Sequence, residues 1–519
     1  MTSILTRSII EVSEHLQSGL LTSTELLNLC LERVKKTECL NAFITITEEL
    51  ARKQASTSDE RYKKGKRLGM LDGIPIAVKD NFNIMGVRTT CGSNMLKNYI
   101  SPYNATVIQH LCNQGAVIIG KTNMDEFAMG SGTIDSIFGP TKNPYYSGLK
   151  FKLIHRNSIN DTHLNTAFCK KYGVENDWYI SGGSSGGSAV ALTTGTCFGA
   201  LGSDTGGSTR NPASRCGVVG FKPTYGLLSR HGLIPLTNSM DVPGILVRTV
   251  DDVSLILDVL AGHDQLDSTT VSDKLTFYVP DEISIKDMHI GIPKEYHCFG
   301  LSNEVVEIWT RIADLFERNG AIVSSVSLPH TQYSIVCYSI LNSCEVASNF
   351  ARYDGIEYGH KTMKNYASMA DSYAASRHEG FSEVVRGRIL AGNYFLLKEN
   401  YEKYFVQAMK VRRLILNDFQ NVFKKGIDFL LTPVTLTDAP LYSNWITKDN
   451  REQVSVEDFC TQPVNMAGIP AVSLPCGFSN KGLPLSLQII GQSFQEKKLL
   501  IIAKWLEQQL NFPLWDLNE

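Results

Sequence analysis

Short apolar runs bounded by glycine recur in the first half of the chain and limit the folds that it can adopt. Three of them are Ile74–Val78, Ala116–Ile119 and Phe198–Leu201, and residues 104–113 have the periodicity of a helix. Runs of this length are typical of strands that are buried on both faces, and their alternation with helices is typical of α/β proteins. The sequence therefore predicts an α/β sandwich with a largely buried sheet.

Helices with recognisable ends are predicted on both sides of these runs. Residues 22–36 begin with Thr22-Ser23-Thr24-Glu25, a capping-box pattern, and the polar stretch 51–68 is interpreted as an exposed helix. Residues 303–319 are predicted to form an amphipathic helix that ends at Gly320. The apolar face expected for this helix consists of Val306, Trp309, Ile312, Ala313 and Phe316.

The second half of the chain is predicted to add a helical region over about residues 339–424, and a helix near 497–510 follows it. Further strands are expected at 428–432, 471–475 and 485–490. Because the sequence contains no internal repeat and no low-complexity linker, a single domain over residues 1–519 is predicted.

Residues 145–178 interrupt this pattern. The stretch is polar, mixed in charge and without periodicity. We interpret it as a surface insertion that carries no chemistry.

Composition excludes several functional classes. The 519 residues carry a net charge of −2, so the chain as a whole has no electrostatic basis for holding a nucleic acid. The 12 cysteines include no Cys-x-x-Cys pair and no zinc-type spacing, and several, such as Cys30, Cys112 and Cys337, are expected to be reduced, buried thiols. No apolar run approaches the roughly 18 residues that a membrane span requires.

Two segments rich in glycine and serine give the strongest chemical signal. Residues 181–188 read SGGSSGGS, and residues 204–210 read DTGGSTR. Glycine lets the backbone approach a ligand closely, and successive N–H groups can surround an oxyanion. The apolar runs on both sides argue against a flexible linker, which leaves a phosphate loop or a catalytic loop.

The same residues resemble the amidase signature family. The similarity covers residues 182–208 and continues through 210–213 (RNPA) and 217–224 (GVVGFKPT). Upstream, residues 72–80 (DGIPIAVKD) are similar to the lysine motif of that family. The resemblance implies the amidase signature fold, in which helices flank both faces of a large mixed β-sheet, with a signature core at about residues 65–260.

Within that family, the sequence most resembles the A subunits of glutamyl-tRNA(Gln) amidotransferases, in their mitochondrial branch. Residues 226–246 and 383–401 carry this narrower similarity. The insertion at 145–178 departs from the compact bacterial form and resembles mitochondrial members.

The family resemblance implies a catalytic set of three residues. Ser208 matches the nucleophile, Ser184 the bridging serine that follows a cis peptide bond, and Lys79 the base. Since all three are present, an inactive relative is disfavoured. The residues that match the oxyanion hole are Thr205, Gly206, Gly207 and Ser208.

This chemistry sets a condition on the lysine. A serine hydroxyl is a weak nucleophile until a base takes its proton, and a lysine amine accepts a proton only when it is neutral. The expected relay passes the proton from Ser208 through Ser184 to Lys79. We therefore expect a site that is short of water and free of nearby carboxylates, because both conditions lower the pKa of the amine.

Three further residues match substrate contacts of the glutamine-using members. Arg388 precedes an Ile-Leu-Ala-Gly run and matches the arginine that holds the α-carboxylate. Asp458 lies upstream of Pro-Val-Asn and matches the aspartate that meets the α-ammonium group. Tyr338 occupies a place like that of a substrate-contacting tyrosine.

The resemblance also implies a substrate and partners. Glutamine would be hydrolysed to glutamate and ammonia for the conversion of Glu-tRNA(Gln) to Gln-tRNA(Gln). A partner B subunit would use ATP and Mg and bind most of the tRNA, and a small C subunit would join the other two. No cofactor or metal is expected in this chain, and no membrane.

The mitochondrial matrix is the location that the resemblance implies. The N-terminal residues match an import sequence poorly, since Arg7 is accompanied by Glu11 and Glu14.

Two shorter patterns suggest other chemistries. Residues 115–122 fit the phosphate-loop pattern GxxxxGK[ST], but 116–119 has the pattern of a strand, so nucleotide binding is not expected there. Residues 182–186 fit the GxSxG nucleophile elbow, which would make Ser184 the nucleophile and require a histidine such as His231 or His263. That interpretation leaves the lysine motif unexplained.

Two other functions remain as alternatives. A stand-alone amidase acting on small amides would not need Arg388 or Asp458, and its fatty-amide form is disfavoured because no apolar hairpin for membrane binding is visible. A non-enzymatic assembly scaffold would not need the three residues of the catalytic set.

Overall fold

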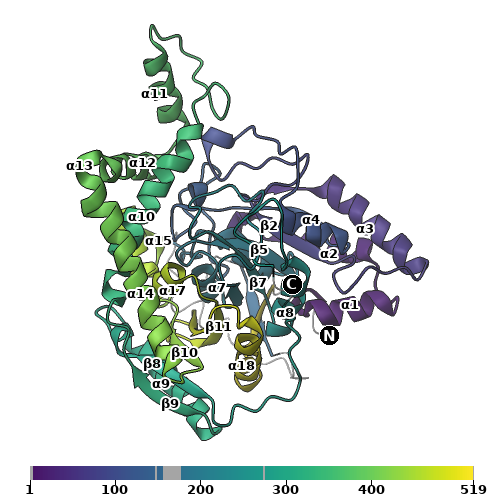
Figure 1. Cartoon of the computed structure of the whole chain (residues 1–519). Helices are drawn as coiled ribbons and strands as arrows, with labels where there is room; N and C mark the ends of the chain where they lie inside the picture. The colour runs from purple at the N-terminus through teal and green to yellow at the C-terminus, as the bar shows by residue number, and fades with distance from the viewer. Residues whose placement is uncertain (1–3, 146–148, 156–176, 273–274, 518–519) are drawn as a thin grey trace.

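Strands from nearly the whole length of the chain join one mixed sheet in the computed structural model, which describes residues 4–145, 149–155, 177–272 and 275–517 (Figure 1). The described strands form an 11-stranded sheet in the order β1-β3-β2-β5-β7-β6-β11-β12-β10-β8-β9. Their bounds are β1 Phe43–Ile46, β2 Pro75–Lys79, β3 Val117–Thr122, β5 Gly199–Asp204, β6 Val219–Lys222, β7 Val242–Val247, β8 His289–Pro293, β9 Ile322–Val326, β10 Phe429–Pro433, β11 Ala471–Phe478 and β12 Pro484–Ile490.

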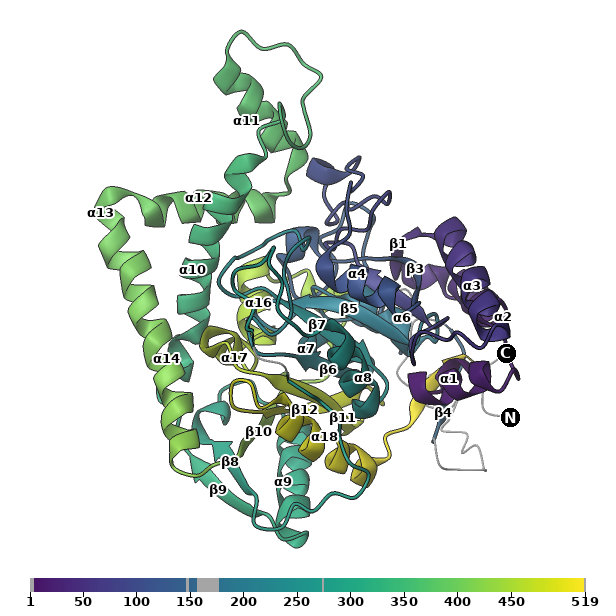
Figure 2. The same cartoon turned by 45° about the vertical axis from the view of Figure 1, so that its right-hand side comes forward.

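Helices surround this sheet, so the predicted α/β class is confirmed (Figure 2). The α-helices are α1 Ile9–Gln17, α2 Ser23–Lys36, α3 Glu48–Lys63, α4 Thr106–Asn113, α6 Gly186–Thr193, α7 Arg210–Cys216, α8 Val250–Leu260, α9 Asn303–Arg318, α10 Ser334–Asn349, α11 Met369–Gly380, α12 Glu383–Leu396, α13 Lys398–Tyr401, α14 Gln407–Lys424, α15 Tyr442–Trp445, α16 Asn450–Glu457, α17 Gln462–Ala467 and α18 Glu496–Leu510. Short 3-10 helices lie at Ile4–Thr6, Glu38–Leu40, Asn94–Leu96, Glu126–Ala128, Lys294–Tyr296, Thr331–Tyr333 and Phe350–Arg352, and a π-helix lies at Glu402–Val406.

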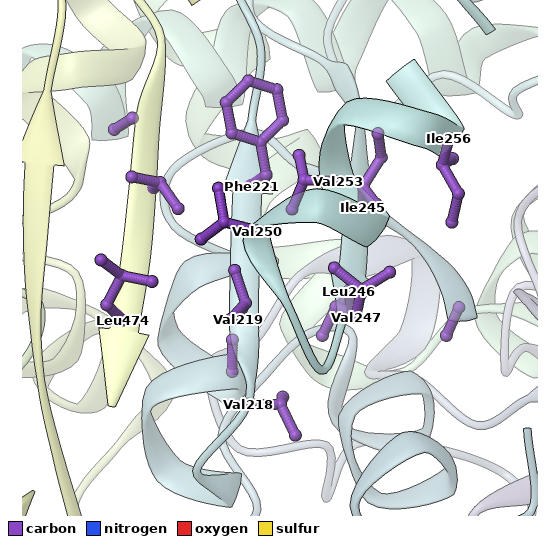
Figure 3. Close-up of a cluster of buried hydrophobic side chains, with 14 of the residues drawn as sticks. Val218, Val219, Phe221, Ile245, Leu246, Val247, Val250, Val253, Ile256 and Leu474 are labelled. Carbon is purple, nitrogen blue, oxygen red and sulfur yellow. The ribbon is translucent and has the colours of Figure 1, made fainter. Parts of the chain in front are cut away.

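Neighbouring residues of one strand show how the two faces of the sheet differ. Val219 and Phe221 of β6 pack with residues of β7 and α8 in a buried apolar cluster (Figure 3). Gly220, which lies between them, faces α7, since a side chain added there would meet Ala213. The α8 face is therefore filled by branched and aromatic side chains, whereas α7 lies close against the sheet where a side chain is missing.

The predicted helical region forms an outer layer beside the sheet (Figures 1 and 2). Helix α10 packs against both α12 and α14, and α14 packs against α17. Residues 353–368 within the predicted region are not helical, and α11 projects from the body at the top of both views. This layer carries Tyr338 on α10 and Arg388 on α12.

Most predicted elements are present with small shifts of their ends. The capping box of α2 forms between Thr22 and Glu25 as expected, and the predicted helix 51–68 is α3, which ends at Lys63. The buried face expected for α9 was partly wrong. Val305 and Ile308 are buried in place of Val306 and Ala313, whereas Trp309, Ile312 and Phe316 are buried as predicted.

The interpretation of residues 145–178 as a surface insertion is wrong for the part of it that the structure describes. Phe151–Ile154 forms strand β4, which pairs antiparallel with β13, Leu514–Leu517. Tyr145 and Leu153 are buried in an apolar cluster with Trp515. The rest of the predicted insertion, residues 146–148 and 156–176, lies outside the described residues. The prediction of a single domain over the whole chain stays a prediction.

The contact between α10 and α12 depends on a glycine. A side chain at Gly392 would clash with the backbone carbonyl of Ser343 on α10. We expect Gly392→Ala to lower the free energy of unfolding by about 1–3 kcal/mol, because backbone atoms cannot move away as a flexible side chain could. Chemical denaturation of the purified chain measures this change.

Gly387 on the same helix provides the matched control, since no atom lies within 4 Å of a side chain added there. Gly387→Ala should leave the stability unchanged or raise it by up to about 1 kcal/mol. Equal destabilisation by both substitutions would mean that the close contact of α12 with α10 is not the reason why position 392 requires a glycine.

Candidate active site

The buried amine of Lys79 lies at the centre of the site. Lys79 ends β2, and its side chain is fully buried. The Nζ atom is 2.7 Å from the Oγ of Ser184 and 2.9 Å from the Oγ of Ser203. Strands β2 and β5 are parallel neighbours, so their carboxyl ends meet at one edge of the sheet and bring Ser203 beside the lysine.

Burial lowers the pKa of the Lys79 amine to about 7. Three buried carboxylates partly oppose this shift, and they belong to Asp125, Asp204 and Asp241. The expectation of a site without nearby carboxylates was therefore wrong. Among the described residues, however, none of these acids forms an ion pair with Lys79, and a substantial part of the amine is neutral at physiological pH.

Each nearby carboxylate is held by other groups. Asp125 accepts the backbone N–H groups of residues 133–135, and Asp241 accepts the hydroxyl of Thr205 at 2.7 Å. Asp204 pairs with Arg210, whose Nη2 is 3.0 Å from its Oδ1. Burial alone would raise the pKa of Asp204, but the charge and hydrogen bonds of Arg210 outweigh burial and lower this pKa to about 2.

The two glycine- and serine-rich segments lie side by side. The Gly183–Ser184 peptide bond is cis, as the resemblance predicts. The Ser185 N–H donates to the carbonyl oxygen of Ser208 at 3.1 Å, which joins the loop before α6 to the loop before α7. Ser184 is fully buried, and Ser208 is 5% exposed. The fold thus brings Lys79, Ser184 and the Ser208 loop together at one end of β2 and β5.

The loop that contains Ser208 presents unused donors. Among the described residues, no acceptor is found for the backbone N–H groups of Gly206, Gly207 and Ser208. A side chain on Gly206 would lie 3.1 Å from the ring of Tyr338, and one on Gly207 would lie 3.1 Å from Oδ1 of Asp458. These N–H groups can donate to an oxyanion.

Asp458 provides a buried acceptor beside this loop. Its Oδ2 accepts the hydroxyl hydrogen of Ser131 at 3.1 Å, whereas its Oδ1 is buried and has no partner among the described residues. Burial, and then the charge of Glu457, raise the pKa of the Asp458 carboxyl well above its usual range. This oxygen is therefore placed to accept a hydrogen bond from a bound ligand. Sequence reasoning did not identify Ser131 or Ser203, because single serines outside a motif carry no signal.

Arg388 and Tyr338 line a cavity of about 170 Å³ between α10 and α12. The Tyr338 hydroxyl is 3.3 Å from the Nδ2 of Asn342, and burial raises its pKa. The Tyr338 ring also lies against Gly206, so the same side chain lines this cavity and contacts the Ser208 loop.

The two alternative motifs do not form the sites that they suggest. Residues Val117–Thr122 form β3 with every residue buried, and Lys121 pairs with Asp80 at 2.8 Å, so the strand prediction is confirmed and no phosphate loop forms. His231 contacts Thr106 and stacks on Tyr103, and His263 contacts Thr270. In the described part of the chain neither histidine contacts Ser184.

Other site types were also sought in the described residues. Their His, Cys, Asp and Glu side chains do not gather in any group of three or more that could hold a metal ion. The described cysteines are free, and Cys30 and Cys337 are buried as expected, whereas Cys112 is half-buried. No described helix has both the length and the apolar character needed to cross a membrane.

Comparison with known proteins gives consistent matches over nearly the whole chain. The family model described as Amidase matches residues 25–150 and 174–500. A relative from Bos taurus, named as the A subunit of mitochondrial glutamyl-tRNA(Gln) amidotransferase, is 58% identical over 518 residues, which cover 99% of this chain and 96% of the relative. The relative of the same name from Homo sapiens is 56% identical with the same coverage.

A solved structure shares both the fold and part of the sequence. The crystal structure of the A subunit of glutamyl-tRNA(Gln) amidotransferase from Thermotoga maritima is 34% identical, with a TM-score of 0.75. The match covers 100% of this chain and 99% of that one.

The pKa of Lys79 predicts how the site responds to pH. We expect the rate at which a small sulfonyl fluoride modifies Ser208 to fall about tenfold per pH unit below a midpoint near pH 7, and to level off above it. The reason is that the amine can take a proton only in its neutral form, which predominates above the midpoint. Intact-mass measurement of labelling at pH values on both sides of the midpoint gives the profile.

Lys79→Met should remove the midpoint as well as most of the labelling, since methionine fills similar space without a basic nitrogen. Ser208→Ala should prevent labelling at every pH and so identify the modified serine. A wild-type rate that rises only above about pH 9 would mean that the amine keeps the pKa of an exposed lysine.

Proposed function

Because the chain belongs to the Amidase family, we propose that it is the glutamine-hydrolysing A subunit of a mitochondrial glutamyl-tRNA(Gln) amidotransferase. The observation that carries the proposed chemistry is the 2.7 Å contact between the buried Lys79 amine and Ser184, beside the Ser208 loop. A buried amine held by hydroxyl groups is a base, whereas an amine paired with a carboxylate is a fixed cation.

The proposed reaction begins with the neutral amine. Lys79 accepts the proton of Ser184 while Ser184 accepts the proton of Ser208, and the Ser208 oxygen attacks the side-chain amide carbon of glutamine. The N–H groups at Thr205, Gly206, Gly207 and Ser208 stabilise the resulting oxyanion, and losing one such donor typically costs about 10²–10³ in rate. Return of the proton to the amide nitrogen releases ammonia. Water then hydrolyses the acyl ester and releases glutamate.

The proposed substrate contacts account for the choice of a free amino acid. Arg388 offers a guanidinium to the α-carboxylate, and the unpaired Oδ1 of Asp458 accepts from the α-ammonium group. Tyr338 lies between the arginine cavity and the Ser208 loop and contacts the substrate backbone. A stand-alone amidase for simple amides would have no use for this arginine and this unpaired acceptor oxygen.

The proposed partners are those that the resemblance to A subunits of glutamyl-tRNA(Gln) amidotransferases implies. The B subunit uses ATP and Mg to activate Glu-tRNA(Gln) and consumes the ammonia, and a small C subunit joins the other two. With a net charge of −2, this chain leaves most of the tRNA contact to the B subunit.

Replacement of Ser208 separates the two halves of the proposed function. In the assembled complex, Ser208→Ala should lose glutamine-driven transamidation by at least about 10³-fold, because no acyl ester can form. Ammonia-driven transamidation should stay within about twofold of the wild type, since added ammonia bypasses this chain. Formation of Gln-tRNA(Gln) from charged tRNA measures both activities.

Loss of both activities in a complex that still assembles would point to the scaffold alternative. Rapid hydrolysis of simple amides by the isolated chain, unaffected by Arg388→Ala, would favour the stand-alone amidase instead.

A further inference from the structure

Arg388 is held by two neutral side chains from different helices. Its Nη1 donates to Oδ1 of Asn342 on α10 at 3.0 Å, and its Nη2 donates to Oδ1 of Asn450, the first residue of α16, at 3.1 Å. Arg388 itself lies on α12. Three helices that are far apart in the sequence therefore fix the plane of one guanidinium group.

The Nδ2 atom of each asparagine is also hydrogen-bonded, and these bonds determine how each side-chain amide is oriented. The Nδ2 of Asn342 is 3.3 Å from the Tyr338 hydroxyl. The Nδ2 of Asn450 donates to the carbonyl oxygen of Met129 at 3.2 Å and to Oδ2 of Asp135 at 3.3 Å. Turning either amide over would place its NH2 group against the guanidinium, where both groups are donors. The acceptor oxygens therefore face Arg388.

Both of these hydrogen-bond partners of the arginine are neutral. In the described part of the chain no carboxylate forms an ion pair with Arg388. The acid linked to it is Asp135, which lies on the far side of Asn450 and has its pKa raised to about 7 by burial and by the charge of Asp125. A carboxylate in direct contact would compete with an anionic ligand for the same donors.

We propose that Asn342 and Asn450 are positioning residues that aim Arg388 at the α-carboxylate of the substrate and, being neutral, keep its positive charge for that carboxylate. This inference rests on the proposed function. In this inference Asn342 and Asn450 act together with Arg388. The three residues discriminate a free amino acid from a substrate that has a neutral group in place of the α-carboxylate. Asn342 is the better position to test, because it is 1% exposed and is fixed by α10.

The alternative is that the two asparagines only link the helices. A link would affect stability, and it would affect turnover of charged and neutral substrates equally. A positioning role affects the KM for a substrate that carries an α-carboxylate, leaves kcat largely in place, and has little effect on a substrate that lacks this carboxylate.

The test is Asn342→Asp in the assembled complex, with glutamine and glutaminamide compared as substrates. Glutaminamide carries a neutral carboxamide in place of the α-carboxylate. Aspartate keeps the acceptor oxygen and the size of asparagine, and the Tyr338 hydroxyl can turn to donate to it. We expect the KM for glutamine to rise at least about tenfold and the KM for glutaminamide to change less than about twofold, because a hydrogen-bonded charge is added beside the arginine.

Asn393→Asp is the matched control, since this exposed asparagine lies on α12 and, within the described part of the chain, donates to the carbonyl of Ile389 in its own helix. It adds the same charge without touching Arg388 and should leave both KM values unchanged. Asn342→Ala is the second variant, and it should raise the KM for glutamine about tenfold by loss of one charge-assisted bond.

The outcomes separate the two proposals. If the wild-type complex does not hydrolyse glutamine, the proposed function fails. If it does, but Asn342→Asp and Asn342→Ala raise the KM for both substrates equally or for neither, the positioning role is overturned. Ammonia-driven transamidation and the thermal midpoint of each variant show whether the complex is intact.

Discussion

A buried lysine amine that no carboxylate of the described residues pairs with is the constraint on which the rest of the site depends. Placing an ionised amine in a fully buried position is costly, and it is usually avoided by an ion pair or by loss of the proton. At Lys79 the contacts at 2.7 and 2.9 Å are hydroxyl oxygens, so loss of the proton is the route that the structure favours. The parallel pairing of β2 and β5, the glycine-rich loops and the separate bonding of the nearby acids all preserve this condition.

The neighbouring strand shows the contrast. Lys121 lies near the end of β3, next to β2, and is as deeply buried as Lys79, but it forms an ion pair with Asp80 at 2.8 Å. Two adjacent parallel strands thus hold two buried lysines, of which one contacts hydroxyl groups and the other is paired with a carboxylate. The difference comes from the group that faces each amine and not from its depth, which explains why burial predicted from the sequence could not distinguish a structural lysine from a base.

The sequence predicted the α/β class, six of the 11 described strands of the sheet and the loops that meet at Lys79, because apolar runs, caps and glycine-rich motifs are local signals. Strand β4 was missed since its partner, Leu514–Leu517, is hundreds of residues away and its own sequence has no clear period. Ser203 was missed because it belongs to no motif and is brought to the lysine only by strand pairing. The acids near Lys79 could be seen in the sequence, but their separate partners could be seen only in three dimensions.

The pairing of β13 has a consequence for the order in which the molecule can be completed during synthesis. Arg33 of α2 is 4% exposed, and its ion pair at 2.9 Å is with Asp516, 483 residues later. Until residue 516 has left the ribosome, α2 must keep a cation whose partner does not yet exist. The packing of Arg33 against Asp516 can therefore be completed only near the end of translation, although its other acceptor, the carbonyl oxygen of Thr194, is made much earlier.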